Sequence, residues 1–119
     1  MKYALLVLIA FLTTCDKLDD GYICTDQFVY GLNVIVKDAS TNDILVEGLT
    51  IVARDDEYEE VLMNFPNSTN YVGAGERPGN YTITVNSMDY QEYSTQTIVV
   101  GADECHVIPE VVEVLLQLN

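Results

Sequence analysis

The sequence predicts an all-β protein, a seven-strand antiparallel β-sandwich that follows an N-terminal signal helix. Three observations lead to this prediction. Apolar and polar residues alternate in short runs, turn residues recur roughly every dozen positions, and no helical period follows the N-terminal apolar segment. This combination is typical of sandwiches built from short strands.

The expected strands follow from the alternation, taken along the chain. In the first strand Leu32, Val34 and Val36 share one face, and in the second Ile51 and Ala53 do so. Turn residues or short loops separate the strands, with an apolar bridge at 44–46 and a bulge or sheet edge at 109–110, where a proline cannot donate to a ladder. The seven strands are expected within 28–37, 49–54, 58–65, a two-strand hairpin at 71–85, 90–100 and 107–118.

The hairpin at 71–85 has the most detailed turn chemistry. Gly73 and Gly75 let the backbone leave the first strand, Pro78 fixes a turn dihedral, and Gly79 is expected to take a positive φ. Glu76 and Arg77 flank this turn and are expected to form an exposed pair of little energetic weight. The inward face of the second strand is expected to consist of Tyr81, Ile83 and Val85.

Length and charge restrict the possible functions. A chain of 119 residues with 49% hydrophobic residues suits one domain with one core. The formal net charge is −14, with 19 acidic and 5 basic residues. A surface of this sign repels nucleic acid and anionic lipid head groups, so we expect no nucleic-acid partner.

The first 15 residues, MKYALLVLIAFLTTC, have the form of a secretion signal. One Lys precedes an apolar run that is too short to span a bilayer, which needs roughly 20 residues. Residues 12–15, Leu-Thr-Thr-Cys, resemble a bacterial lipobox, although Thr14 stands where Gly, Ala or Ser is preferred. The resemblance implies cleavage before Cys15, acylation of its thiol, including palmitate, and attachment to the lipid bilayer. An ordinary cleaved signal with an incidental cysteine is the alternative.

The chain therefore divides into a signal peptide at 1–14, an acidic tether at 15–23 and a β-sandwich domain at 24–119. The Lys and acidic residues of the tether resemble the signals that send some lipoproteins to the outer face of the outer membrane. Asp16, directly after the cysteine, resembles an inner-membrane retention signal. A plain solvated linker explains the same residues. We expect a cell-envelope protein anchored to the outer membrane, with the leaflet left open.

Two further cysteines, Cys24 and Cys105, are expected to form a disulfide that clamps the two ends of the domain. An exported, oxidising compartment favours their pairing, and no Cys-x-x-Cys motif indicates redox activity. His106 is expected to be a strand residue beside this disulfide.

Four motifs connect the domain to a known family: VIVKDA at 34–39, YVGAGERPGNY at 71–81, YQ at 90–91 and CHV at 105–107. Together they resemble the carboxypeptidase regulatory-like domain, a transthyretin-like sandwich, over roughly residues 24–118. Asp89 departs from the glycine that the family usually has before Tyr90. The resemblance implies a non-catalytic companion module of the kind found beside metallopeptidases.

No enzyme is expected. A zinc peptidase site needs several His and carboxylate ligands, whereas His106 is the single histidine and no His-Glu-x-x-His is present. The related hydrolases resemble this fold but use several histidines and a Tyr-Arg-Gly-Ser terminus, where this chain reads VLLQLN. We therefore expect no catalytic residue, no cofactor and no metal site, and an unknown envelope protein or glycan as partner.

Two binding sites remain as alternatives. The acidic run at 55–60 has hard oxygen ligands suited to calcium but lacks the alternating Asp and Gly of a loop site. Tyrosines on strands are usually packing residues, yet four of them could form a platform that stacks on glycans. Those four are Tyr58, Tyr71, Tyr90 and Tyr93. The expected function is a non-catalytic accessory or interaction module of the envelope, with a glycan- or calcium-binding surface lipoprotein as the alternative.

Overall fold

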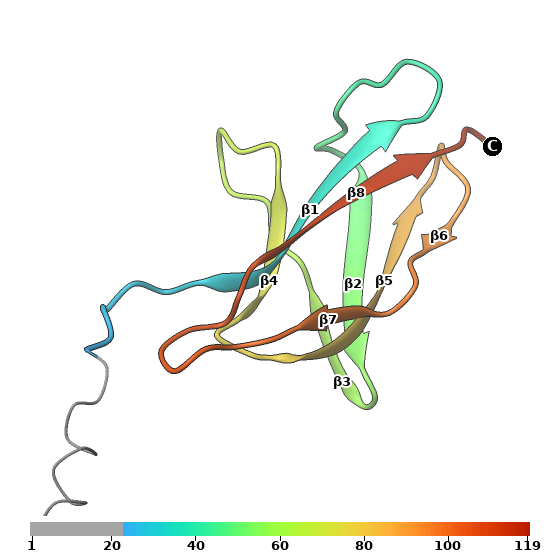
Figure 1. Ribbon diagram of the computed structural model, residues 1–119. Helices are drawn as coiled ribbons and strands as arrows, with labels where there is room; N and C mark the ends of the chain where they lie inside the picture. Colours follow the sequence, from blue (N-terminus) through green and yellow to red (C-terminus); the bar gives the residue numbers. More distant parts are fainter. Residues whose placement is uncertain (1–22) are drawn as a thin grey trace, which may run out of the picture.

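A computed structural model describes residues 23–119 and shows an all-β domain, as the sequence predicts (Figure 1). The expected signal peptide and Cys15 lie outside the described residues. In the described part no helix is long and apolar enough to cross a membrane. Residues 23–119 contain eight strands: β1 (Tyr30–Asp38), β2 (Leu49–Asp55), β3 (Tyr58–Val61), β4 (Tyr71–Gly75), β5 (Gly79–Ser87), β6 (Tyr93–Ser94), β7 (Ile98–Val100) and β8 (Glu110–Leu116).

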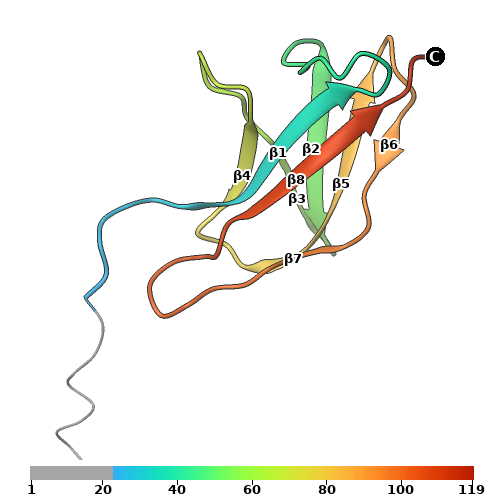
Figure 2. The same ribbon diagram turned by 45° about the horizontal axis from the view of Figure 1, so that its top comes forward.

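The strands form two sheets that face each other as a sandwich (Figure 2). One sheet has three strands in the order β4-β1-β8. The other has five, with the order β3-β2-β5-β6 and β7 paired to the first residues of β5. The five-stranded sheet is antiparallel throughout, because each of its pairs runs in opposite directions.

The core lies between the sheets and follows the predicted alternation. Leu32, Val34 and Val36 are fully buried, and so are Tyr81, Ile83 and Val85 from the opposite sheet. Burying a large aliphatic or aromatic side chain contributes about 1.5–3 kcal/mol to stability, so these two strands supply much of the apolar stabilisation. The inward-facing residues of β2, Ile51 and Ala53, complete the centre of the same cluster.

The prediction that 71–85 is a hairpin is wrong. β4 pairs with β1 in one sheet, whereas β5 pairs with β2 in the other. The connection between them is a corner that crosses the sandwich. Positive φ occurs at Ala74 (53°), near the end of β4, and at Glu76 (48°) in the corner, and not at Gly79, where it was expected.

The glycines of this corner serve close packing. A Cβ on Gly73 would collide with the Leu62 side chain, and one on Gly75 would collide with the Phe28 ring. A Cβ on Gly79 would meet the carboxylate of Asp55. The need for glycine therefore comes from neighbours that are distant in sequence.

Two further corrections concern the strands after β5. The sandwich is not wholly antiparallel, because β8 runs parallel to β1 with Leu32 opposite Glu110 and Asp38 opposite Leu116. The expected strand at 90–100 is divided into β6 and β7, which raises the count from seven to eight. Thr95 lies between them. Its amide still donates to the Ile83 carbonyl (2.9 Å), but the Ile83 amide donates to Oγ1 of Thr95 (3.0 Å).

The third expected strand, 58–65, ends early at Val61, because the chain then pairs with a strand of the other sheet. Leu62 still donates to Ile51 of β2 (2.8 Å), but Met63 forms a bridge with Val72 of β4 in the other sheet. The chain thus changes sheets at this point.

Candidate functional site

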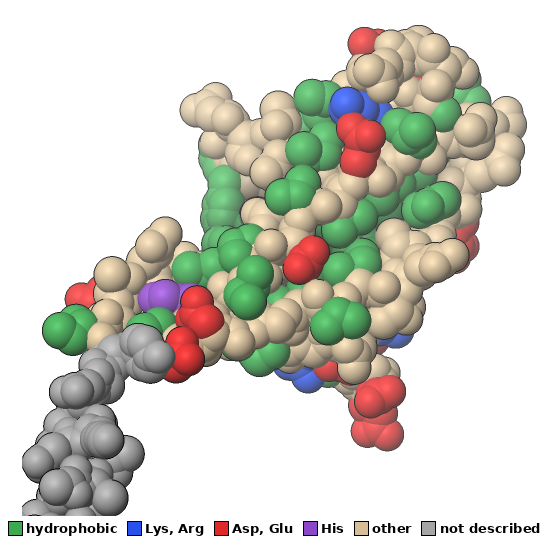
Figure 3. Space-filling model, in the orientation of Figure 1, with side chains coloured by type: hydrophobic (Ala, Val, Ile, Leu, Met, Phe, Trp, Pro, Cys, Tyr) green, Lys and Arg blue, Asp and Glu red, His purple; other side chains and the backbone are tan. Residues whose placement is uncertain are grey.

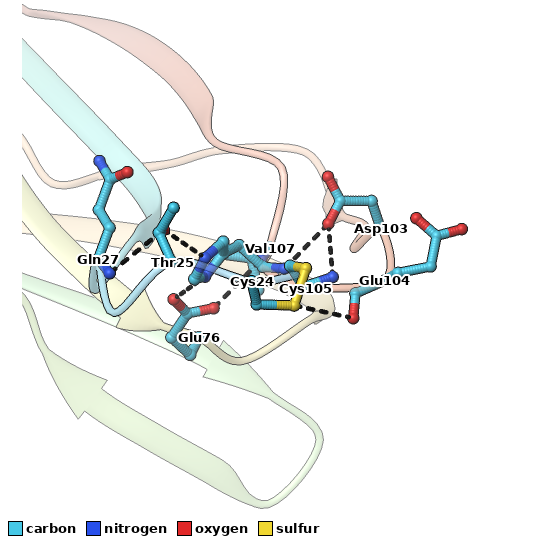
Figure 4. The surroundings of a disulfide bond; sticks show 9 residues. Cys24, Thr25, Gln27, Glu76, Asp103, Glu104, Cys105 and Val107 are labelled. Atoms are coloured by element: carbon cyan, nitrogen blue, oxygen red, sulfur yellow. Dashed lines mark hydrogen bonds and ion pairs between the residues drawn. A yellow bond between two sulfur atoms is a disulfide. The ribbon is translucent and has the colours of Figure 1, made fainter. Parts of the chain in front are cut away.

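Several polar cross-links meet at the disulfide end of the domain. Cys24 and Cys105 form a disulfide, as predicted, with their Cα atoms 5.2 Å apart (Figure 4). The bond closes a loop between residues 81 positions apart and attaches the segment before β1 to the connection between β7 and β8. It therefore fixes the place at which the N-terminal segment reaches the sandwich.

Glu76, in the corner between β4 and β5, joins three segments at this end. Its carboxylate accepts hydrogen bonds from the amide of Val29 (3.0 Å) and the amide of Val107 (3.2 Å). It also pairs with Nδ1 of His106 at 2.7 Å. Partial burial acts to raise the pKa of Glu76, but the bonds from His106 and the two amides outweigh it and hold the pKa below its ordinary value. The carboxylate is thus kept ionised as a structural cross-link.

His106 lies beside the disulfide, as predicted, but in the connection before β8 and not on a strand. Its Nε2 is 3.2 Å from Oγ1 of Thr25, so the ring links the N-terminal segment to Glu76. Asp103 shapes the turn, because its Oδ1 accepts from the amides of Cys105 (2.8 Å) and His106 (2.9 Å). These backbone bonds lower the pKa of Asp103. Both ring nitrogens of the histidine therefore have protein partners.

The expected Glu76–Arg77 turn pair does not form, because each side chain binds a different element. Arg77 pairs with Asp55 at the end of β2 (3.1 Å) and donates to the hydroxyl of Tyr81 (2.9 Å). Its guanidinium also lies 3.6 Å from the ring centroid of Tyr58, a cation–π contact. No spacing in the sequence indicates these long-range partners. The one sequence feature that pointed to this site was the position of the single histidine next to Cys105.

The acidic run at 55–60 is divided among several protein partners. Asp55 binds Arg77, Glu59 binds Arg54 (2.8 Å), and Glu60 accepts from the Tyr58 hydroxyl (2.7 Å). The Glu60 carboxylate also accepts from the amide of Ala74 (3.1 Å). Acidic side chains gather at the tip of the β2–β3 hairpin, at the lower edge of Figure 3. Within residues 23–119 no three His, Cys, Asp or Glu side chains are grouped so that they could hold a metal ion.

The four candidate tyrosines lie in different surroundings. Tyr71 is buried at 6% exposure, and its burial raises the pKa of its hydroxyl. Tyr58 lies under Arg77, and Tyr90 donates to Asp38 (2.6 Å). That bond to a carboxylate raises the pKa of Tyr90 to about 12. Tyr93 is exposed at 41%. Three of the four are thus engaged with the protein, each with different groups.

No pocket is found over residues 23–119. The ionisable side chains at the disulfide end hold three segments together and line no cavity. In the comparisons with known proteins, no family model matches the chain, and no curated protein matches it.

Proposed function

We propose that this chain is a non-catalytic lipoprotein, attached to the bilayer through acylated Cys15, whose β-sandwich serves as an accessory or interaction module of the bacterial cell envelope. The observation that carries the proposal is the clamp at the disulfide end. Cys24 follows Cys15 by only nine residues, and it is tied to Cys105. A disulfide of this kind is typical of an exported compartment.

The contacts around the clamp support the same proposal. A bilayer-attached domain needs a firm connection where the tether reaches it. The disulfide, the Thr25–His106 contact and the Val29–Glu76 bond all hold the segment that follows the tether. The motifs at 71–81 and 105–107, which include Glu76 and His106, are those that resemble the carboxypeptidase regulatory-like domain. We propose that the sandwich is of this transthyretin-like type.

The experiment is intact mass spectrometry of the chain extracted from membranes. We expect a mature protein that begins at an acylated Cys15 and carries one disulfide. A matched Cys15→Ser variant should lose the lipid mass and should no longer be processed before residue 15. A mature chain that starts at another residue and partitions into the aqueous phase would refute the proposal.

A further inference from the structure

The sandwich has two ends, and the N-terminal segment reaches only one of them. This segment, the disulfide and the β7–β8 connection lie together at one end, and the opposite end is formed by other loops (Figure 1). We call that opposite end the distal end and define it as residues 39–48, 88–92 and 117–119. If Cys15 is acylated, the short tether places the clamped end nearer the bilayer, and the distal end faces away from it.

The distal end is held together as one surface by Asp38, the last residue of β1. Asp38 is 6% exposed, and its Oδ1 accepts from the amides of Ser40 (2.7 Å) and Thr41 (3.0 Å). Its Oδ2 accepts from the hydroxyl of Tyr90 (2.6 Å), which joins the β1–β2 loop to the segment after β5. A surface that is already ordered in the free protein loses little conformational entropy when a partner binds.

The last residues of the chain belong to the same network. Gln91 donates from its amide to the carbonyl of Gln117 (2.8 Å). Asn119 donates from its amide to the carbonyl of Asp89 (3.1 Å) and from its side chain to that of Met88 (2.8 Å). All three segments of the distal end are therefore connected.

The distal end exposes apolar side chains. Met88 is 91% exposed and Leu118 is 55% exposed, and the bond from Asn119 to Met88 holds their segments side by side. Ile44 and Val46 in the β1–β2 loop are also exposed, at 44% and 37%. These exposed side chains supply apolar contacts beside an ordered polar network, and protein interfaces combine apolar contacts with a polar rim.

The charge at this end has one sign. Asp43, Glu47 and Asp89 are exposed and take part in none of the ion pairs of the described residues. Lys37, near the end of β1, is already paired with Glu113 at 2.7 Å. The other two described basic residues, Arg54 and Arg77, pair with the acidic run near the β2–β3 turn.

We propose that the distal end docks a basic protein of the envelope, one that presents Lys or Arg side chains around an apolar contact. Charge complementarity selects this occupant, because exposed carboxylates next to apolar side chains attract cations and repel other acidic surfaces. A second copy of this chain, with a formal charge of −14, would place acidic side chains against acidic ones. The inference rests on the proposed function, which supplies the orientation.

The first test is photo-crosslinking of the full chain in its own membranes. A photoreactive phenylalanine analogue replaces Met88 at the distal end, Glu57 at the tip of the β2–β3 hairpin, or Val111 on the outer face of β8. We expect a discrete adduct from position 88 and none from 57 or 111, and the adduct should contain a protein whose crosslinked segment is rich in Lys or Arg.

The matched charge controls use the position-88 crosslinker. The triple change Asp43→Lys, Glu47→Lys and Asp89→Lys should reduce the adduct at least tenfold. A control protein carries three reversals away from the distal end: Asp56→Lys, Glu57→Lys and Glu104→Lys. Its yield of the position-88 adduct should stay within about twofold. If the distal triple variant fails to fold, the corresponding Asn and Gln changes give the same comparison with a smaller expected loss.

A defined probe tests the chemistry without a natural partner. A peptide of alternating Lys and Leu, added to the purified acylated protein in detergent, should shift the amide NMR signals of the distal end at lower concentration than those of residues 55–60. An all-Lys peptide of equal charge should lose this preference, because it supplies no apolar contact.

Several outcomes would overturn the inference. They are an adduct of twice the chain mass, a lipid adduct at position 88, adducts only at 57 or 111, and an adduct that survives the distal charge reversal. Mass spectrometry of the same membranes separates this failure from that of the proposed function. Absence of the position-88 adduct with Cys15 acylated refutes the docking surface alone, whereas an unacylated Cys15 refutes the proposed function.

Discussion

The disulfide should account for a large part of the stability of the domain. Replacing Cys24 and Cys105 by Ser removes a cross-link between residues 81 positions apart. In the chain-entropy model a closed loop of this length restricts the unfolded chain by about 4.5 kcal/mol, close to the whole stability of a marginal small domain. With a urea m-value of about 2 kcal/mol/M, the unfolding midpoint should fall by roughly 2 M.

The assay is urea unfolding followed by circular dichroism. Both proteins carry Cys15→Ser, so they differ only in whether Cys24 and Cys105 are present. The expected mechanism is also specific. Cys24 lies outside β1, so its loss should leave the sheets intact in the native state, and the m-value should rise because the unfolded chain can expand further. A fall in the free energy of unfolding of less than about 1 kcal/mol would refute the reasoning.

Three further predictions concern the core and the ionisable groups. Leu32→Ala, at a fully buried position, should cost about 2–5 kcal/mol in denaturant unfolding, whereas Val111→Ala on the exposed face of β8 should change stability by less than about 0.5 kcal/mol. Similar losses at both positions would contradict the assignment of the core. The pKa of Glu76 is lowered in the folded state by the bonds from His106 and two amides. Its stabilising contribution is therefore present above the ordinary pKa of a glutamate, about 4.3, and is lost as the pH falls below that value through the lowered folded-state pKa. Glu76→Gln should flatten this acid limb of a thermal-unfolding series. An acid limb that is unchanged in the variant would remove Glu76 as its source. The pKa of Tyr90 is raised to about 12, so its contribution to stability is complete below about pH 10 and is lost as the pH rises from about 10 to about 12. Ultraviolet titration should detect a tyrosine with a pKa of about 12 whose pKa falls in Asp38→Asn, because the variant removes the carboxylate that opposes ionisation. Finding no late tyrosine would contradict the Tyr90–Asp38 contact.

The sequence by itself determined the all-β class, the inward face of the main strands and the disulfide. Alternation with a period of two identifies which side chains face the core, since a strand places successive side chains on opposite faces. It correctly placed Leu32 and Ile83 inside. The pairing of Cys24 with Cys105 followed from the expected exported compartment.

The tertiary structure alone decided how the strands are connected. Local turn chemistry predicted a hairpin at 71–85, but turn residues show only that the chain bends and not which strand lies beside it. The positive φ at Ala74 and Glu76 and the close packing at Gly73 depend on β1, Leu62 and the opposite sheet. The parallel pairing of β8 with β1 is likewise a contact between segments far apart in the chain.

The same division applies to the candidate site. Glu76 and His106 are 30 residues apart, and only folding brings them to 2.7 Å. Residue type identified the cysteines, because a disulfide needs two specific side chains in an oxidising compartment. A carboxylate gives no such signal, since 19 acidic residues are chemically alike in the sequence and their neighbours in space assign each its role.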